Sequence, residues 1–284
     1  MESFLPYREV FLENDFSRKG GRIFLRVFSP HIAPQAVVIV SHGFGEHSGI
    51  YVEFAGYLAQ HGFLVVCPDF PGHGISSGRR GVIDSLDSYL LCLDAARIWA
   101  ESVSDGLSVF VVGHSMGGLI AACYALFRPE YVAAVALSAP ALSLDGVPSW
   151  QRFLANSVMR LFPHFRMHVR LNLPDLSRDP VALARLLSDP LCHNYGSVSM
   201  LKAMEDGITR FRENAERYPV PVLLMQGEFD RIVPADVNMT LFDLFPSTDK
   251  ELRVYDGAFH HLFIDLCREE VQADILSWLK SIAI

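Results

Sequence analysis

The sequence has few of the features that nucleic-acid, zinc-binding or disulfide-linked proteins share. Its formal net charge is −8, so no overall basic field is present to replace phosphate counterions. The five cysteines are an odd number without C-x-x-C spacing, which indicates free thiols in a reducing compartment. The eleven histidines form no H-E-x-x-H pattern. We therefore expect no nucleic-acid partner, no metal and no cofactor.

Long apolar runs are also absent. Residues 1–20 mix charges throughout, without the apolar segment of a secretory signal. No uninterrupted apolar run reaches the roughly 18 residues that a transmembrane helix needs. A cytoplasmic protein is expected, and nothing in the pattern indicates an oligomeric state. With 284 residues, half of them hydrophobic, the chain suits one large α/β domain that carries an insertion.

One stretch organises the rest of the chain: a buried strand that runs into a Gly-x-Ser-x-Gly turn. Residues 109–112 are apolar, the motif surrounds Ser115, and an Ala- and Leu-rich helical pattern follows. Small neighbours let the chain turn sharply, which pushes the serine out of the pleat and towards the positive end of the next helix. This arrangement is typical of the nucleophile elbow of α/β-hydrolases.

On both sides of this stretch, apolar strands alternate with helical patterns. Such alternation predicts a mostly parallel, doubly wound sheet with right-handed crossovers. The first 30 residues instead alternate polar and apolar positions, which predicts antiparallel edge strands around a turn at 19–21. Buried strands are expected at 36–40, 63–67, 132–137, 220–225 and 251–255, and helices at 51–61, 86–101 and 263–282.

The alternation stops between about residues 141 and 219. This stretch contains helical patterns but no convincing strand, and it is rich in Arg, Pro and Met. We interpret it as a helical cap, or lid, inserted into the α/β-hydrolase fold. The core would then comprise residues 1–140 and 220–284, and the cap residues 141–219.

The serine of an elbow needs a base to remove its proton, and the base needs an orienting acid. In hydrolases of this fold the partners follow in the order serine, acid, histidine, each on a turn after a strand. One downstream strand ends in a turn that holds Glu228 and Asp230, and another ends in a turn that holds His260 and His261. The pattern alone leaves both pairs open.

Several short motifs occur in a fixed order along the chain. They are His42–Gly49, Gly72–Gly74, Gly113–Gly118, Ser188–Leu191, Gly227–Asp230 and Gly257–His260. In this order they resemble the monoglyceride lipase/lysophospholipase family, over most of the chain from about residue 20. The resemblance implies Ser115 as nucleophile, Asp230 as orienting acid, His260 as general base, and a cap that covers an acyl tunnel.

The oxyanion of a tetrahedral intermediate needs backbone N–H donors that are fixed in advance. One is expected from Met116, the residue after the nucleophile, where the helix dipole adds to its effect. The other should come from the turn after the first buried parallel strand, and the resemblance maps it to Phe44. His42, His73 and His114 are interpreted as loop-bracing or buried side chains rather than metal ligands.

The residues expected to contact the alcohol part of the ester depart from the family pattern. A monoglyceride lipase is expected to carry an arginine that helps the residue at the Glu46 position hold glycerol, but Ile50 occupies that position. A cap tyrosine of the same polar pocket is replaced by Leu186. Glu46, Ile50 and Leu186 are therefore candidate substrate contacts. The loss of polar groups weakens the expected selectivity for glycerol.

These features predict a serine hydrolase that cleaves lipid-like carboxylic esters of small amphiphilic substrates, with monoacylglycerol among them. A lysophospholipase, another carboxylesterase or a thioesterase would use the same residues. No acidic cluster is available in the cap to hold a substrate α-amine, which disfavours an aminopeptidase. A non-catalytic binding module would be expected to lack one member of the serine, acid and histidine set, and all three are present.

The cap sequence carries one local excess of charge. Residues 146–174 contain no acid, and their four arginines are interspersed with aromatic and aliphatic residues. An amphipathic basic helix of this kind can lie on an anionic membrane surface. Alternatively, the apolar face packs on the acyl tunnel and the arginines stay in water. Both interpretations stay open at this stage; the residues concerned are Trp150, Arg152, Phe153, Leu154, Val158, Arg160, Arg166 and Arg170.

Overall fold

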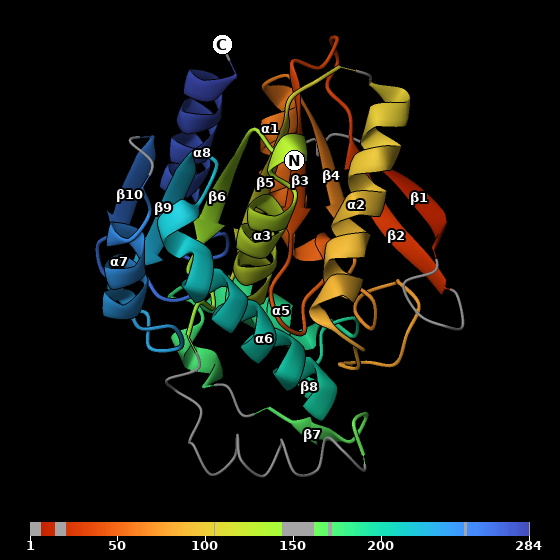
Figure 1. Cartoon of the computed structure of the whole chain (residues 1–284), viewed down its shortest axis with the longest axis vertical. Helices are drawn as coiled ribbons and strands as arrows, with labels where there is room; N and C mark the ends of the chain where they lie inside the picture. The colour runs from red at the N-terminus through yellow and green to blue at the C-terminus, as the bar shows by residue number, and fades with distance from the viewer. Residues whose placement is uncertain are drawn as a thin grey trace.

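The computed structural model describes residues 7–14, 21–104, 106–143, 162–169, 172–246 and 249–283. Eight strands form one sheet in the order β1-β2-β4-β3-β5-β6-β9-β10, with helices on both faces (Figure 1). The strands are β1 (Tyr7–Asn14), β2 (Gly21–Phe28), β3 (Ala36–Ser41), β4 (Phe63–Pro68), β5 (Val109–His114), β6 (Ala134–Ser138), β9 (Val222–Gly227) and β10 (Lys250–Tyr255).

The sheet is parallel from β4 to β10 and antiparallel at its β1 and β2 end. This pattern confirms the predicted α/β-hydrolase fold class, with its mostly parallel sheet. The β1–β2 pair matches the edge strands expected from the alternating N-terminal sequence, and the residues of the predicted turn at 19–20 lie outside the described ranges. Every residue of β3, β4, β5, β6 and β9 is buried, because helices cover both faces of a parallel sheet.

Two layers of helices enclose the sheet. On one face of the sheet, α1 (Val52–Gln60) and α8 (Arg268–Ile282) share a hydrophobic cluster with alternate residues of the strands. On the other, α2 (Leu86–Val103), α3 (Met116–Phe127) and α6 (Val198–Asn214) share the larger cluster, to which α7 (Ala235–Asp243) also contributes. The short 3-10 helices are η1 (Ser48–Tyr51), η2 (Pro129–Tyr131), η3 (Leu173–Asp175) and η4 (Ala215–Arg217).

The segment between β6 and β9 was expected to be helical throughout, and this expectation is incomplete. It contains α5 (Pro180–Ser188) and α6, but also β7 (Arg166–His168) and β8 (Tyr195–Ser197), which pair antiparallel. Strands of three residues are too short to show alternation, so the sequence gives them no signal. The helix α6 packs in the same layer as α2 and α3, so a separate cap domain at 141–219 stays a prediction.

Most of the basic amphipathic stretch lies outside the described residues. Trp150, Arg152, Phe153, Leu154, Val158, Arg160 and Arg170 belong to this part of the chain. Arg166 is described and begins β7. Of the helices that the structure describes, none combines the length and the apolar character needed to cross a membrane.

Candidate active site

The chain turns from β5 into α3 at Ser115, and this turn is strained. Ser115 has φ 53° and ψ −118°, a conformation that residues other than glycine rarely adopt. Its N–H donates to the carbonyl of Ser138 on β6 at 2.9 Å, which fixes the bend. A Cβ at Gly117 would collide with the carbonyl oxygen of Ser41 on β3. The small motif residues therefore let α3 begin directly against the sheet, with the serine side chain half-buried at its start.

Two turns from the far end of the sequence reach Ser115. The Nε2 atom of His260 lies 3.0 Å from Ser115 Oγ, and its Nδ1 atom lies 2.8 Å from Asp230 Oδ2. Asp230 follows β9 and His260 follows β10, two parallel neighbours in the sheet, so their loops emerge at the same edge. His260 and Asp230 are 2% and 7% exposed, which shields both contacts from water. The structure thus brings together the three residues that the sequence singled out.

The carboxylate of Asp230 is held by three groups besides His260. Its Oδ1 accepts hydrogen bonds from the N–H groups of Ile232 and Val233, both at 2.9 Å. Its Oδ2 also accepts from Nε2 of Gln226 at 2.9 Å, and Gln226 is itself bonded to Asn238. Sequence reasoning missed Gln226, although a glutamine at the end of the apolar β9 strand is a usable signal. These bonds fix the direction of the carboxylate towards His260.

The other members of the two ambiguous turns have different partners. Glu228 is exposed and accepts a hydrogen bond from the N–H of Gly257 at 2.9 Å, so it links the two turns. His261 points away from Ser115, and its Nε2 atom lies 3.1 Å from Glu46 Oε1. The carbonyl of Asp256 accepts from Arg178. Geometry therefore separates the alternatives that the sequence left open.

Glu46 is a buried carboxylate on the loop that follows β3. Its Oε2 accepts hydrogen bonds from the N–H of Gly43 at 3.0 Å and from the hydroxyl of Tyr51 at 2.7 Å. Burial acts to raise the pKa of Glu46, but the pairing with His261, helped by His114 and Tyr51, holds that pKa well below its usual range. The carboxylate is thus charged and fully engaged with protein groups. A direct contact of Glu46 with substrate stays a prediction.

His114 lies between the two histidine turns. Its ring centroid is 4.1 Å from that of His261 and 4.9 Å from that of His260. Burial and the neighbouring His261 lower the pKa of His114 well below its usual value, so the ring is neutral near pH 7. Its Nδ1 faces the carbonyl and hydroxyl of Ser138. His114 packs between the two turns, and its buried Nε2 has no hydrogen-bond partner among the described residues.

The loop expected to supply the second oxyanion donor is fixed on both sides. Glu46 accepts a hydrogen bond from the N–H of Gly43, and the N–H of His193, from the segment between β6 and β9, donates to the Gly45 carbonyl at 2.8 Å. Gly45 has φ 71°, and a Cβ there would collide with the backbone of His193. Among the described residues, the N–H of Phe44 donates to no other protein group. Met116 is the first residue of α3, so its N–H has no partner within the helix.

The two departures from the family pattern lie in different surroundings. Ile50 packs partly buried against the hydrophobic cluster beneath α1 and α8. Leu186 is the one buried residue of α5. Nε2 of His47 lies 3.0 Å from Oδ2 of Asp189, which joins the loop after β3 to the segment that follows α5. As substrate contacts, Ile50 and Leu186 stay predictions.

Among the described residues, two groups of side chains lie close enough together to be considered as metal ligands. Glu46, His114 and His261 form one buried group, and His47, Asp189 and Cys192 form the other. In the first, the imidazoles of His114 and His261 stack with their planes 30° apart, and Glu46 already accepts two hydrogen bonds. The Nε2 atom of His114 and both ring nitrogens of His261 are buried without a hydrogen bond among the described residues, although His261 Nε2 lies 3.1 Å from Glu46 Oε1. The expectation of no metal stays a prediction.

The fold and this arrangement are those of an α/β-hydrolase: a serine at a strand-to-helix turn meets a histidine and an acid at the carboxyl edge of a parallel sheet. The sequence matches the family described as "Serine aminopeptidase, S33" over residues 32–266. The chain therefore belongs to this family of hydrolases.

Several of the proteins that the chain resembles are monoacylglycerol lipases. The chain is 34% identical to human monoglyceride lipase, over 92% of this chain and 86% of the relative. It is 31% identical to a monoacylglycerol lipase of Mycolicibacterium smegmatis, over 95% and 97%. The crystal structure of Paleococcus ferrophilus monoacylglycerol lipase superposes with a TM-score of 0.85 at 34% identity, covering 92% of this chain and 99% of that one. The predicted relationship to monoglyceride lipases is confirmed.

Proposed function

We propose that this protein hydrolyses carboxylic esters of lipid-like acyl groups through Ser115, His260 and Asp230. The observation that carries the proposal is the pair of contacts from His260, 3.0 Å to Ser115 Oγ and 2.8 Å to Asp230 Oδ2. The similarity to monoacylglycerol lipases supports an acyl ester as the bond that is cleaved.

In the proposed reaction, Oγ of Ser115 attacks the ester carbonyl carbon while Nε2 of His260 takes its proton. Asp230 holds the ring orientation and stabilises the imidazolium that forms. His260 then gives the proton to the leaving alcohol oxygen, and an acyl group remains on Ser115. A water molecule, deprotonated by His260, attacks the acyl carbonyl and releases the carboxylic acid.

The developing oxyanion would accept hydrogen bonds from the N–H groups of Met116 and Phe44. Both groups are fixed before the reaction, so they stabilise the transition state without reorganisation. We assign Glu46 as a positioning residue for this loop, because its carboxylate holds the neighbouring Gly43 N–H at 3.0 Å. His261 and Tyr51 in turn hold Glu46 in place.

The leaving alcohol is the less constrained half of the substrate. With Ile50 in place of the arginine expected beside Glu46, the described residues offer less polar contact for a glycerol group. A buried hydrogen-bonding site strongly rejects analogues that lack its partner group, whereas an apolar one discriminates weakly. We therefore propose acceptance of several alcohols, monoacylglycerol included, rather than a strict preference for glycerol.

Contact of the cap with a membrane surface forms the remaining part of the proposal. Phe162 and Phe165, at the edge of the described cap, are 64% and 55% exposed. Aromatic side chains at an exposed rim favour an interface between water and lipid. The protein would reach amphiphilic substrate through this side.

A panel of esters tests the proposal, with medium-chain p-nitrophenyl esters, monoacylglycerols and lysophospholipids as members. We expect turnover of the first two classes by the wild type and none by the Ser115→Ala variant. If lysophospholipid were cleaved while both other classes stayed inert, the monoacylglycerol assignment would be wrong. If all three stayed inert, the proposed ester hydrolysis would fail as a whole.

A further inference from the structure

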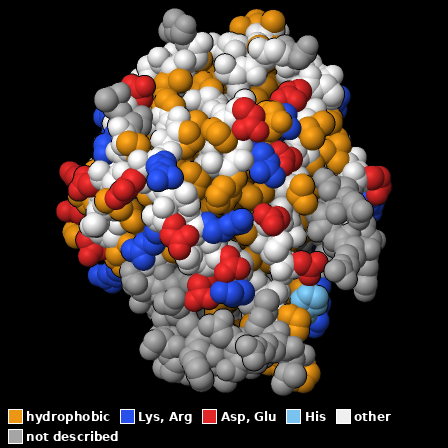
Figure 2. All heavy atoms as spheres, viewed as in Figure 1, with side chains coloured by type: hydrophobic (Ala, Val, Ile, Leu, Met, Phe, Trp, Pro, Cys, Tyr) orange, Lys and Arg blue, Asp and Glu red, His pale blue; other side chains and the backbone are white. Residues whose placement is uncertain are grey.

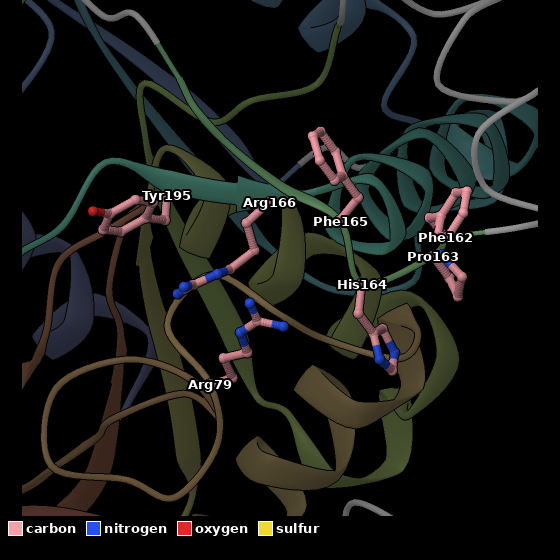
Figure 3. A pocket seen from close by; sticks show the side chains of 7 residues that line it. All are labelled: Arg79, Phe162, Pro163, His164, Phe165, Arg166 and Tyr195. Carbon is pink, nitrogen blue, oxygen red and sulfur yellow. The ribbon is translucent and has the colours of Figure 1, made fainter.

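A pocket of about 460 Å³ opens at the cap, beside β7 and the loop that precedes α2. The residues around it include Arg79, Phe162, His164, Phe165, Arg166 and Tyr195 (Figure 3). None of the residues assigned to ester hydrolysis lines it. Two arginines, three aromatic side chains and a histidine therefore line a pocket that has no role in the proposed reaction.

Two guanidinium groups face each other in this pocket. Figure 3 shows Arg79 and Arg166 extending towards one another from separate segments of the chain. The acid beside the pocket, Asp84, pairs with His164 at 3.1 Å. Among the described residues no carboxylate pairs with Arg79 or Arg166, and the sequence from 146 to 174 contains no acid. Two like charges that converge without a counterion favour an anion between them.

The orientation of Arg166 is fixed by its neighbours. Its guanidinium lies 4.9 Å from the ring centroid of Tyr195, and one terminal nitrogen donates to the carbonyl of Arg80 at 3.1 Å. Its Nε is buried and has no hydrogen-bond partner among the described residues. The guanidinium of Arg166 is therefore held in one orientation, and the described residues do not use all of its N–H donors. A planar fork of this kind matches the oxygens of a phosphate or a carboxylate.

The rim of the pocket is apolar and exposed. Phe162 and Phe165, which line the pocket, are 64% and 55% exposed, and Met167, next to Arg166 in the sequence, is 51% exposed. On the face shown in Figure 2, acidic and basic side chains are interspersed over the described residues. An anion site surrounded by exposed aromatic side chains fits a charged group that carries apolar chains beside it.

We propose that Arg79 and Arg166 bind the phosphate group of an anionic phospholipid head group at the membrane surface. Tyr195 holds the Arg166 fork, and the two phenylalanines enter the adjoining lipid. This inference rests on the proposed function, because it assumes that the cap meets lipid. It adds a defined head-group site that is separate from the residues that cleave the ester.

Vesicle binding tests the site without interference from hydrolysis if every protein carries Ser115→Ala. The vesicles consist of phosphatidylcholine alone, phosphatidylcholine with phosphatidic acid, or phosphatidylcholine with oleate at matched charge. Binding should be tightest to the phosphatidic acid vesicles. Arg79→Gln and Arg166→Gln should each weaken that binding about fivefold, the effect expected of one basic residue at an anionic surface. Equal binding by the double Gln variant would overturn the proposal.

Two matched variants distinguish a specific phosphate site from general electrostatic attraction to an anionic surface. Arg166→Lys keeps the charge but removes the fork, so it should restore only part of the binding that Arg166→Gln loses. If the lysine variant bound like the parent, charge alone would explain the binding and the site would be rejected. Arg217→Gln removes an exposed charge from η4, just before β9 begins, and should bind vesicles like the parent.

Calorimetry with inorganic phosphate distinguishes the source of the ligand. Weak or absent binding of free phosphate together with tight vesicle binding supports a lipid head group. Binding of free phosphate without any difference among the three vesicles would contradict the lipid assignment. Hydrolysis of p-nitrophenyl esters by the wild type is measured separately, so failure of the head-group site and failure of the proposed function give different results.

Discussion

His260 and His261 are consecutive residues, and each pairs with a buried carboxylate from a distant loop. His260 pairs with Asp230 at 2.8 Å and reaches Ser115 with its other nitrogen. His261 pairs with Glu46 at 3.1 Å, and Glu46 in turn holds Gly43 beside the expected oxyanion donor. Both pairs join an imidazole to a buried carboxylate, but His260 also has a nitrogen 3.0 Å from Ser115 Oγ. Their difference teaches that direction, rather than residue type, separates a reacting pair from a positioning pair.

The largest expected effect comes from removing the two histidines in turn. His260→Ala should lower kcat for a p-nitrophenyl ester by about a million-fold, as expected when the base of such a triad is lost. His261→Ala should lower kcat far less, by about ten- to a hundredfold, because it acts through Glu46 and the loop. Comparable losses of kcat in the two variants would contradict the distinction between the His260–Asp230 pair and the His261–Glu46 pair.

The two carboxylates should differ in the same way. Asp230→Asn leaves the shape intact but favours the wrong tautomer of His260, so a loss of about ten thousandfold in kcat is expected. Initial-rate kinetics across substrate concentrations give kcat and KM separately. A loss no greater than that of the corresponding Glu46 variant would argue against Asp230 as the orienting acid.

Glu46→Gln tests the positioning role with a conservative change. Weakening its hold on Gly43 should lower kcat about tenfold with little change in KM, which is less than the hundredfold or more expected when an oxyanion donor is removed. Glu228→Gln, at an exposed acid in the neighbouring turn, serves as the matched control and should keep wild-type kinetics. A change confined to KM would instead indicate that Glu46 contacts the substrate.

Ile50→Arg sharpens the comparison by offering Glu46 a cationic partner besides His261. The arginine should compete with His261 for the carboxylate and add a donor for a glycerol hydroxyl, raising the preference for monoacylglycerol over a p-nitrophenyl ester about tenfold. The ratio of kcat/KM for the two substrates reports this preference. An unchanged ratio with normal stability would show that Ile50 lies outside the alcohol site.

The smallest expected effect is a loss of stability at acidic pH. Burial lowers the pKa of His42, His73 and His114 below 6.5, and that of His193 to about 4. The unfolded chain binds protons at these residues below about pH 6.5 while the folded protein does not. The free energy of unfolding should therefore fall as pH drops from 6.5 towards 4, by at most about 1.4 kcal/mol per pH unit for each histidine.

Denaturant unfolding at pH 7 and pH 5 measures this slope. His193→Gln should make it shallower, because one group with a lowered pKa is removed. His31→Gln is a suitable control, since His31 lies on an exposed loop. A slope that stayed the same in the His193 variant would show that its ring is not buried neutral in the folded protein.

Much of the fold was predictable because its strands are short apolar runs with clear ends. The positions of β3, β4 and β5 follow from such runs, and the elbow at Ser115 follows from glycine spacing. The three-residue strands β7 and β8 were missed, because their pairing depends on backbone contacts between distant segments. Sequence spacing favoured Asp230 over Glu228 and His260 over His261 only through a family resemblance.

The missed parts of the site share one physical cause. The contact of His261 with Glu46 joins residues more than 200 positions apart, and neither residue type alone predicts the other. Gln226 donates a hydrogen bond to Asp230 from the end of β9, a strand whose other side chains are apolar. The convergence of Arg79 and Arg166 likewise depends on the β7–β8 ribbon. Such long-range polar contacts leave no periodic pattern in the sequence.

Labelling with a fluorophosphonate probe tests most directly that His260, and not its neighbour, activates Ser115. The probe forms a covalent bond with an activated serine, and peptide mapping locates the labelled residue. We expect rapid labelling of Ser115 in the wild type, labelling at a moderately reduced rate in His261→Ala, and none in His260→Ala. Normal labelling of His260→Ala together with loss of labelling in His261→Ala would contradict the account.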